Sequence, residues 1–273
     1  MRILSGILAL VFLVAAGTMC VAAQGAGALD VQVKTVKVGG KPIKISRKRF
    51  YLLRGGLEAN KDLVSRLKVA NFTSRDCYYC QLHTSKEYIA WLKEKDCESP
   101  YCRQITTEDI AKVPEFQAAY QKGTGGGAGK GPKLSPKTAE KWVTTNLSPE
   151  LRDGFYRQRK SLTDTLLGGV KPLQSSMTDT AAVKAQFIDI LLTGLRAADP
   201  KKPDDKTETF LVTNLFPLEV GDKSYVWACE IEVGTTKTAK LTLADPPETS
   251  KRVKNCEVIV RQLPTCNQGT CSQ

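Results

Sequence analysis

Apolar and polar side chains alternate most clearly in residues 170–273. Short runs there carry β-branched and aromatic residues at every second position, which is the spacing of a strand with one buried face. Turns rich in Pro, Gly, Asp and Lys separate these runs. Short strands at this spacing predict an antiparallel sandwich or an open barrel. The runs are Ala185–Leu192, Thr209–Leu215, Tyr225–Val233, Thr238–Leu243 and Val253–Val260.

Residues 59–169 follow the helical period instead. Leu63 and Leu67 belong to one apolar stripe, and Thr84 with Glu87 three residues later has the form of a capping box. Proline suits the first turn of a helix, and glycine commonly ends one. Helices are therefore predicted to begin near Asn60, Thr84, Pro114 and Ser148, and the last is predicted to end at Gly168 and Gly169.

The N-terminal part predicts a β hairpin. Val31–Val33 alternates at period two, Gly39 and Gly40 form a hairpin-turn signal, and Ile43–Ile45 begins the returning strand. We therefore expect an α+β protein with an N-terminal β hairpin, a helical middle region and a C-terminal antiparallel β sandwich-like domain. The predicted boundaries are 1–23 for an export signal, 24–58 for the hairpin segment, 59–169 for the helical region and 170–273 for the β domain.

A glycine-rich stretch interrupts the helical region at residues 123–134. It superficially suggests a phosphate-binding loop, but Lys130 is followed by Gly131 rather than Ser or Thr, and a helix rather than a strand is predicted before it. Glycine gives a chain flexibility and no side chain to bury. We interpret the stretch as a flexible linker, and the sequence predicts no cofactor.

The first residues have the parts of a secretory signal. Arg2 supplies a positive start, Ile3–Val14 is mostly apolar, and Val21–Ala23 offers small side chains for cleavage before Gln24. An uncleaved membrane anchor is one alternative, because the stretch is long enough to span a bilayer. A lipid-modified Cys20 is another, although the residues before it match a lipobox poorly. Cleavage predicts a secreted, periplasmic or cell-surface protein with no membrane span.

Removal of Cys20 with the signal leaves an even number of cysteines, which in an exported chain favours disulfides. Cys229 and Cys256 both fall on the apolar face of a predicted strand, so we expect them to pair. Cys97 with Cys102 and Cys266 with Cys271 each frame a four-residue turn, which favours local bridges. Cys77 and Cys80 are left for each other, or for Cys97 or Cys102.

Cys77-Tyr-Tyr-Cys80 is the sharpest chemical motif in the chain. The spacing suits a thiol–disulfide redox pair, but the helix predicted after the motif starts only at Thr84, several residues late, and no strand–helix–strand pattern surrounds the motif. A zinc site that combines these thiols with His83 and Cys97 or Cys102 is a further alternative. His83 is the sole histidine, so any histidine-based catalysis must use it. We interpret the two cysteines as parts of the disulfide framework and His83 as a surface residue.

Positive charge is concentrated near the N-terminus. The chain has 40 Lys and Arg against 28 Asp and Glu, and residues 31–57 hold eight of the basic residues and no acidic one. Such a strip attracts polyanions, whereas the same lysines can also serve to keep an edge strand from pairing with other chains. The candidate contact residues are Lys41, Lys44, Arg47, Lys48, Arg49 and Arg54, with the rings of Phe50 and Tyr51 beside them.

These observations favour an exported, disulfide-containing, non-enzymatic binding or surface-associated protein that contacts polyanions. Acidic polysaccharide and anionic membrane surfaces are the expected partners, and no nucleic-acid motif is present. A redox protein using Cys77 and Cys80 is the first alternative, and a hydrolase with an unassigned pair of carboxylates is the second. Asn71 and Asn146 begin glycosylation sequons, which matter only in a eukaryotic source.

Overall fold

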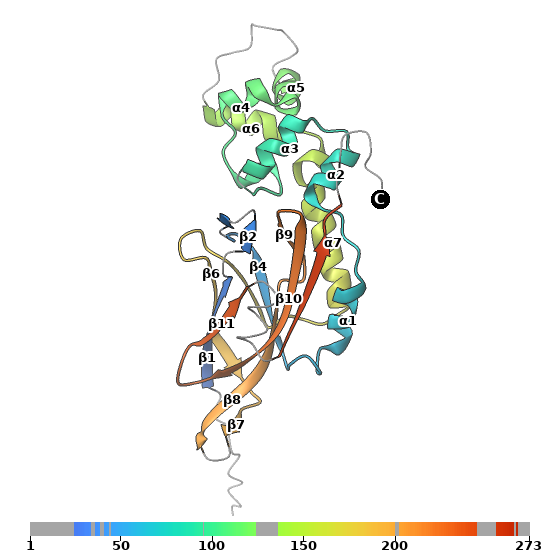
Figure 1. Cartoon of the computed structure of the whole chain (residues 1–273). Coiled ribbons are helices and arrows are strands. Elements are labelled where there is room, and N and C mark those ends of the chain that lie inside the picture. The colour runs from blue at the N-terminus through green and yellow to red at the C-terminus, as the bar shows by residue number, and fades with distance from the viewer. Residues whose placement is uncertain are drawn as a thin grey trace, which may run out of the picture.

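The computed structural model describes residues 25–33, 36–38, 41–43, 45–94, 96–123, 136–199, 202–244, 255–264 and 266. The predicted export signal lies outside these residues, as does the glycine-rich stretch beyond Gly123. The molecule is elongated, with a body of strands at one end and a cap of short helices at the other (Figure 1). It is an α+β fold, as predicted.

Two sheets form the β body. The larger has the order β12-β10-β8-β4-β5, with β7 paired to β8 and β9 to β10, and the smaller has the order β11-β1-β6. Their pairings are antiparallel except that of β1 with β11. The strands are β1 (Gly25–Val33), β4 (Arg49–Arg54), β5 (Gln174–Met177), β6 (Lys184–Leu192), β7 (Arg196–Asp199), β8 (Lys202–Thr213), β9 (Leu218–Val220), β10 (Lys223–Gly234), β11 (Ala239–Leu243) and β12 (Cys256–Gln262).

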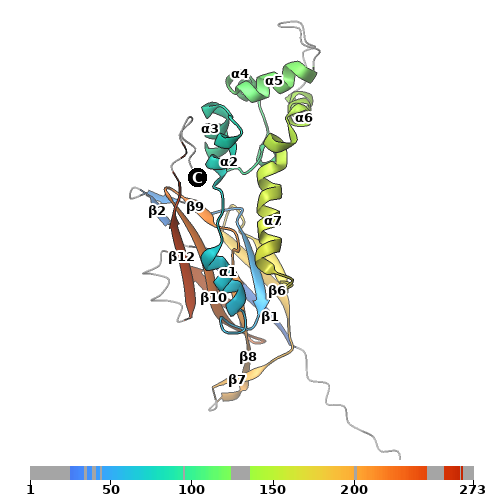
Figure 2. The same cartoon turned by 90° about the vertical axis from the view of Figure 1, so that its right-hand side faces the viewer.

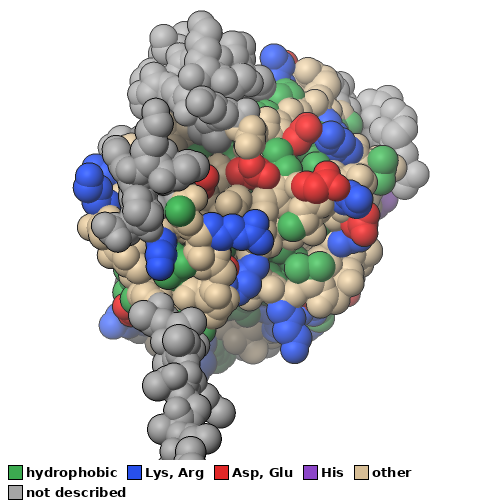
Figure 3. Space-filling model, turned by 90° about the horizontal axis from the view of Figure 1, so that it is seen from below, with side chains coloured by type: hydrophobic (Ala, Val, Ile, Leu, Met, Phe, Trp, Pro, Cys, Tyr) green, Lys and Arg blue, Asp and Glu red, His purple; other side chains and the backbone are tan. Residues whose placement is uncertain are grey.

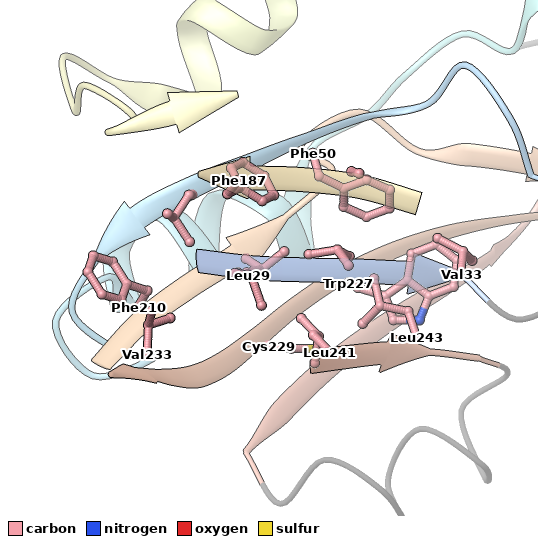
Figure 4. Packing of buried hydrophobic residues seen from close by; sticks show 14 of the residues in the cluster. Leu29, Val33, Phe50, Phe187, Phe210, Trp227, Cys229, Val233, Leu241 and Leu243 are labelled. Atoms are coloured by element: carbon pink, nitrogen blue, oxygen red, sulfur yellow. The ribbon is translucent and has the colours of Figure 1, made fainter. Parts of the chain in front are cut away.

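The apolar core lies between the two sheets. Leu29 of β1 and Phe187 of β6 pack with Phe50 of β4, Phe210 of β8 and Trp227 of β10 (Figure 4), and all five side chains are fully buried or nearly so. The alternation along β1 and β6 follows from this arrangement, because one face meets the larger sheet and the other meets solvent.

Two helices cover the other face of the larger sheet. Leu63 and Leu67 of α1 (Lys61–Val69) and Leu166 of α7 (Phe155–Leu167) pack against Leu211 and Val226. Figure 2 shows both helices on this side of the body. The middle of β8 and β10 is therefore buried on both faces, which explains why period-two alternation gives way there to a continuous buried run.

The cap is built around an aromatic cluster. Tyr79, Tyr88, Trp91 and Phe116 meet in mostly edge-on pairs, and α7 begins with Phe155 in the same cluster before it runs down to the sheet. The cap helices are α2 (Arg75–Gln81), α3 (Lys86–Glu94), α4 (Thr107–Lys112), α5 (Pro114–Gly123) and α6 (Pro136–Asn146), with the 3-10 turn η1 (Pro100–Cys102) and the π-helical turn η2 (Glu150–Gly154).

The N-terminal hairpin is confirmed, but its first strand comes after Val31–Val33, the segment whose alternation predicted it. β2 (Val36–Val38) pairs with β3 (Lys41–Ile43), and the two glycines lie between them. Val31–Val33 instead belongs to β1, which pairs with β6 and β11, whereas β4 pairs with β5 and β8. The N-terminal segment is thus part of both sheets, because the C-terminal strands supply its partners.

The helix boundaries agree with the sequence in part. Pro114 opens α5, and Gly168 follows α7 in the left-handed conformation at φ 56°. The capping box predicted at Thr84 is wrong: the Ser85 hydroxyl accepts the Tyr88 N–H at 3.1 Å, and the Thr84 hydroxyl donates to the Tyr79 carbonyl oxygen instead. Helices α2 and α6 were not predicted.

Candidate functional site

Two predicted disulfides are confirmed. Cys229 and Cys256 face each other on β10 and β12 with a Cα–Cα distance of 4.0 Å. Cys97 and Cys102 close the turn after α3 at 5.6 Å. In both cases the sequence already places the two residues close together, on adjacent strands or across a short turn. The protein is therefore disulfide-containing, as its composition predicts.

The predicted local bridge between Cys266 and Cys271 is wrong. Cys266 pairs with Cys77, 189 residues away in sequence, with a Cα–Cα distance of 5.3 Å. Cys80 is disulfide-bonded as well. The chain leaving β12 passes the first turn of α2, so tertiary proximity decides the pairing rather than the short spacing. This bridge ties the end of the β body to the cap.

The C-x-x-C motif lies on a helix, which corrects the expectation that the helix next to the motif starts only at Thr84. Ser74 caps α2, and its hydroxyl accepts the Cys77 N–H at 3.2 Å. Both cysteines are nevertheless buried, and Cys77 is bonded to Cys266 rather than to Cys80. The motif therefore supplies two separate bridges to the framework.

The remaining chemistry around this motif is sparse. His83 follows α2 with φ 55° and is exposed to solvent. The cysteines of the considered zinc site, including Cys97 and Cys102, are all in disulfides and cannot supply thiolates. Within the described residues, no group of three or more His, Cys, Asp and Glu side chains is placed to hold a metal ion.

Two of the predicted basic contact residues hold the fold together. The Lys48 ammonium lies 2.7 Å from an Asp96 carboxylate oxygen and 3.9 Å from one of Glu98. Arg54 forms an ion pair with Glu208 and donates to the Leu191 carbonyl oxygen at 2.7 Å. These partners are far away in sequence, so a charge count along the chain does not reveal them.

The other predicted contact residues differ in what the structure says of them. Arg47 and Arg49 are exposed, and Arg47 adopts a left-handed conformation at φ 58°. Lys41 belongs to β3, and Lys44 lies outside the described residues. The expected ring contact from Phe50 is wrong, because that side chain is fully buried between the sheets.

Tyr51, by contrast, is half-buried on the face of β4 that packs toward α7, and we call its surroundings the Tyr51 surface. Because Tyr51 pairs with Ser175 and Arg49 with Met177 in the register of β4 and β5, the four side chains share one face. An Arg49 guanidinium nitrogen donates to the Ser175 hydroxyl at 3.1 Å. The surface consists of Arg49 and Tyr51 on β4, Ser175 and Met177 on β5, and Tyr156 and Lys160 on α7.

The Tyr51 surface combines the exposed ring of Tyr156 and the half-buried ring of Tyr51 with positive charge. Tyr156 is 57% exposed and Met177 is 49% exposed. Burial raises the pKa of the Tyr51 hydroxyl, and the Arg49 and Arg159 charges oppose that shift only in part. The hydroxyl is therefore a neutral donor and acceptor at physiological pH. Lys160 shares its charge with Asp164 at 2.7 Å, which leaves Arg49 as the strongest cation of the surface.

Position and rigidity suit this surface to binding. β5 has four residues and is the outer strand of the larger sheet, while the inner side of β4 is anchored in the core by Phe50 and Leu52. At the end of the body opposite the cap, by contrast, Lys and Arg side chains occur at several separate places with acidic side chains among them (Figure 3).

Comparisons with known proteins give no relatives. No protein-family model matches the chain, and no match was found among curated proteins or solved structures. Among the helices that the structure describes, none combines the length and the apolar composition needed to cross a bilayer.

Proposed function

We propose that the protein is an exported, non-enzymatic binding protein that holds an acidic polysaccharide on the Tyr51 surface. The observation that carries the proposal is the placement of Arg49 and Tyr51 on one face of β4, with the exposed ring of Tyr156 beside them. A guanidinium can hold a carboxylate or sulfate through two parallel hydrogen bonds. Tyrosine rings offer a flat apolar face for the C–H side of a sugar and a hydroxyl for its polar groups.

The disulfide framework supports the exported part of the proposal. Four cysteines of the cap and four of the predicted C-terminal region remain after removal of the signal. Every cysteine that the structure describes is in a disulfide. Such a framework persists in oxidising compartments outside the cytoplasm.

A polysaccharide fits the surface better than the alternative anionic partner, a membrane. Lipid surfaces attract clusters of basic residues in rough proportion to their number. The Tyr51 surface instead has few cations and two tyrosine rings, a composition that suits single anionic groups spaced along a chain of sugar rings.

The test is binding of an alginate hexasaccharide to the full oxidised protein by calorimetry. We expect Arg49→Ala and Tyr156→Ala each to weaken binding by about tenfold, which is about 1.4 kcal/mol. Lys112→Ala is the control, because Lys112 is an exposed cap cation paired with Glu108 away from this surface. Raising the salt from about 0.02 M to about 0.5 M is expected to weaken wild-type binding, since the contact is electrostatic.

Three outcomes would contradict the proposal. The first is an affinity that Arg49→Ala and Tyr156→Ala change no more than Lys112→Ala does. The second is binding that is insensitive to salt. The third is binding to phosphatidylglycerol vesicles with none to the hexasaccharide, which would make an anionic membrane the partner.

The redox alternative is tested separately. The bond between Cys77 and Cys266 supports a structural role for the motif. A thiol–disulfide protein would reduce or oxidise a disulfide substrate such as insulin, and Cys80→Ser would abolish that activity. We expect no such activity in the wild type.

A further inference from the structure

We infer that a second site, in the cavity between α2, α7 and the chain that leaves β12, binds an uncharged sugar unit. The cavity has a volume of about 660 Å³, within the range of sites that hold small molecules. The Cys77–Cys266 bridge forms part of its wall. None of the described residues that line it carries a charge, in contrast to the neighbouring cleft around Glu219.

Three residues with carboxamide side chains line this cavity, which we call the amide cavity. Asn71 comes from the loop after α1, Gln81 from the last turn of α2 and Gln158 from α7. All three residues are exposed to solvent, and within the described part of the chain none of their carboxamide groups has a hydrogen bond to another residue. Each carboxamide offers an acceptor oxygen and a donor nitrogen side by side. Thr73 adds a hydroxyl to the same wall.

The apolar part of the amide cavity is formed by two phenylalanine rings. The ring centroids of Phe72 and Phe216 are 6.1 Å apart. The Arg261 guanidinium lies 4.6 Å from the centroid of Phe72, and that of Arg159 lies 4.0 Å from the centroid of Phe216. Arg261 also donates to the Leu67 carbonyl oxygen at 2.9 Å. The rings are therefore held in place before any ligand arrives.

This chemistry matches a neutral sugar. Adjacent hydroxyls of a sugar ring both donate and accept hydrogen bonds, which carboxamides can satisfy in pairs. The C–H face of the ring packs on aromatic side chains. A charged ligand is disfavoured, because the residues that line the cavity carry no charge. The two guanidinium groups beside it are already engaged, that of Arg159 by Glu98 and that of Arg261 by the carbonyl oxygens of Leu67 and Lys68.

A peptide is the competing occupant, since it also carries neutral donors and acceptors. Extended peptides usually bind by adding a strand to a sheet edge, where backbone groups supply a regular series of hydrogen bonds. The amide cavity presents side-chain carboxamides from two helices and a loop instead. Such separate groups suit the irregular hydroxyl pattern of a sugar better than a peptide backbone.

The amide cavity is independent of the Tyr51 surface. Gln158 and Leu162 line the cavity, whereas Tyr156 and Lys160 belong to the surface. Two residues along a helix correspond to a rotation of about 200°, so α7 presents these pairs on opposite sides. Either site can therefore fail its test without affecting the other.

The experiment titrates the full oxidised protein with maltotriose, cellotriose and triacetylchitotriose, followed by NMR shifts and calorimetry. We expect at least one of these neutral trisaccharides to bind, and Gln158→Leu to weaken that binding by about tenfold or more. Gln117→Leu is the control, because Gln117 is exposed on α5 in the cap and does not line the cavity. Arg49→Ala and a rise in salt are expected to leave the affinity unchanged.

Several results would overturn the inference. One is the absence of binding by all three trisaccharides up to about 10 mM, a concentration at which a site with a Kd of about 1 mM would be mostly occupied. Another is equal affinity for the wild type and Gln158→Leu when far-UV circular dichroism shows both to be folded. A third is preferential binding of the neutral tripeptide acetyl-trialanine amide, which would make the occupant a peptide.

Discussion

The β body and the cap are held together by different kinds of contact. In the body, strands from the two ends of the chain pair directly: Leu29 of β1 lies opposite Ala239 of β11, and Leu53 of β4 lies opposite Leu211 of β8. In the cap, helices that follow one another in sequence pack around aromatic rings, and Cys97–Cys102 spans five residues. The body therefore depends on distant pairing, whereas the cap forms largely from local contacts.

A small number of contacts link the two regions. Besides α7 and the Cys77–Cys266 bridge, Lys48 at the start of β4 pairs with Asp96 of the cap. A carboxylate oxygen of Glu219 on β9 accepts the backbone N–H of Arg75 at 2.9 Å, where α2 begins. Stability can therefore be lost in two ways, through the core of the body or through these links.

The largest expected effect comes from the core of the body. Phe187→Ala on β6 is expected to lower the free energy of unfolding by about 3–5 kcal/mol, because the ring is almost fully buried between the sheets. Its neighbour Ile188 is 63% exposed, so Ile188→Ala is expected to change stability by less than about 0.5 kcal/mol. Urea unfolding followed by tryptophan fluorescence measures both variants. Similar losses in the two variants would contradict the assignment of faces on β6.

The next effect separates the link from the cap itself. Cys77→Ser with Cys266→Ser is expected to cost about 3 kcal/mol, because this bridge links the body to the cap, and Cys97→Ser with Cys102→Ser about 2 kcal/mol, because that bridge closes only a short turn. Hydrogen exchange is expected to show the first loss in α2 and the end of β12, with the centre of β10 still protected.

A disulfide map provides the control for these two double variants. If Cys20 is removed with the predicted export signal, Cys271 is the one cysteine left for Cys80 by count. The map is therefore expected to show Cys77–Cys266 and Cys80–Cys271 in the wild type. Recovery of a Cys266–Cys271 peptide would instead restore the local pairing that the sequence favoured and contradict the link.

The sequence predicts the body better than it predicts which segments meet. The alternation in Tyr225–Val233 identifies β10, and a shared apolar face is enough to pair Cys229 with Cys256. The strand Gln174–Met177 carries no such alternation, because it is a short edge strand whose side chains are only half-buried or exposed. The partner of Cys266 depends on where the chain passes α2, which no local pattern records.

The candidate site shows the same limit. Lys48 and Arg54 resemble Arg49 in sequence, yet the first two are engaged by Asp96 and Glu208, which are contributed by distant segments. The sequence shows Tyr51 to be near basic residues, but its pairing with β5 and its position beside α7 depend on the fold. The amide cavity was not predicted at all, because its carboxamides come from three separate segments.

The smallest expected effect concerns pH and the link at Glu219. Burial raises the pKa of the Glu219 carboxyl above its ordinary value of 4.5, and the Arg75 N–H and guanidinium oppose that shift only in part. Asp222, in the turn that follows, has the opposite shift, because the Gln262 carboxamide donates to it at 2.9 Å and lowers its pKa. The two carboxyls are therefore expected to have opposite effects on stability as pH changes.

The direction of each change in stability follows from the number of protons that the folded and unfolded chains bind. Between the ordinary pKa and the raised one, folded Glu219 keeps a proton that the unfolded chain has released, so its contribution to stability falls as pH rises. Glu219→Gln retains an acceptor for Arg75 but has no charge to desolvate. It is expected to match the wild type near pH 3 and to become more stable than the wild type toward pH 7. Asp222→Asn is the control of opposite sign, becoming less stable than the wild type over the same rise in pH because it loses a carboxylate favoured in the folded state.

Urea midpoints measured across this pH range decide between these outcomes. A Glu219→Gln variant that grows less stable toward pH 7 would show that the carboxylate charge strengthens the link to α2.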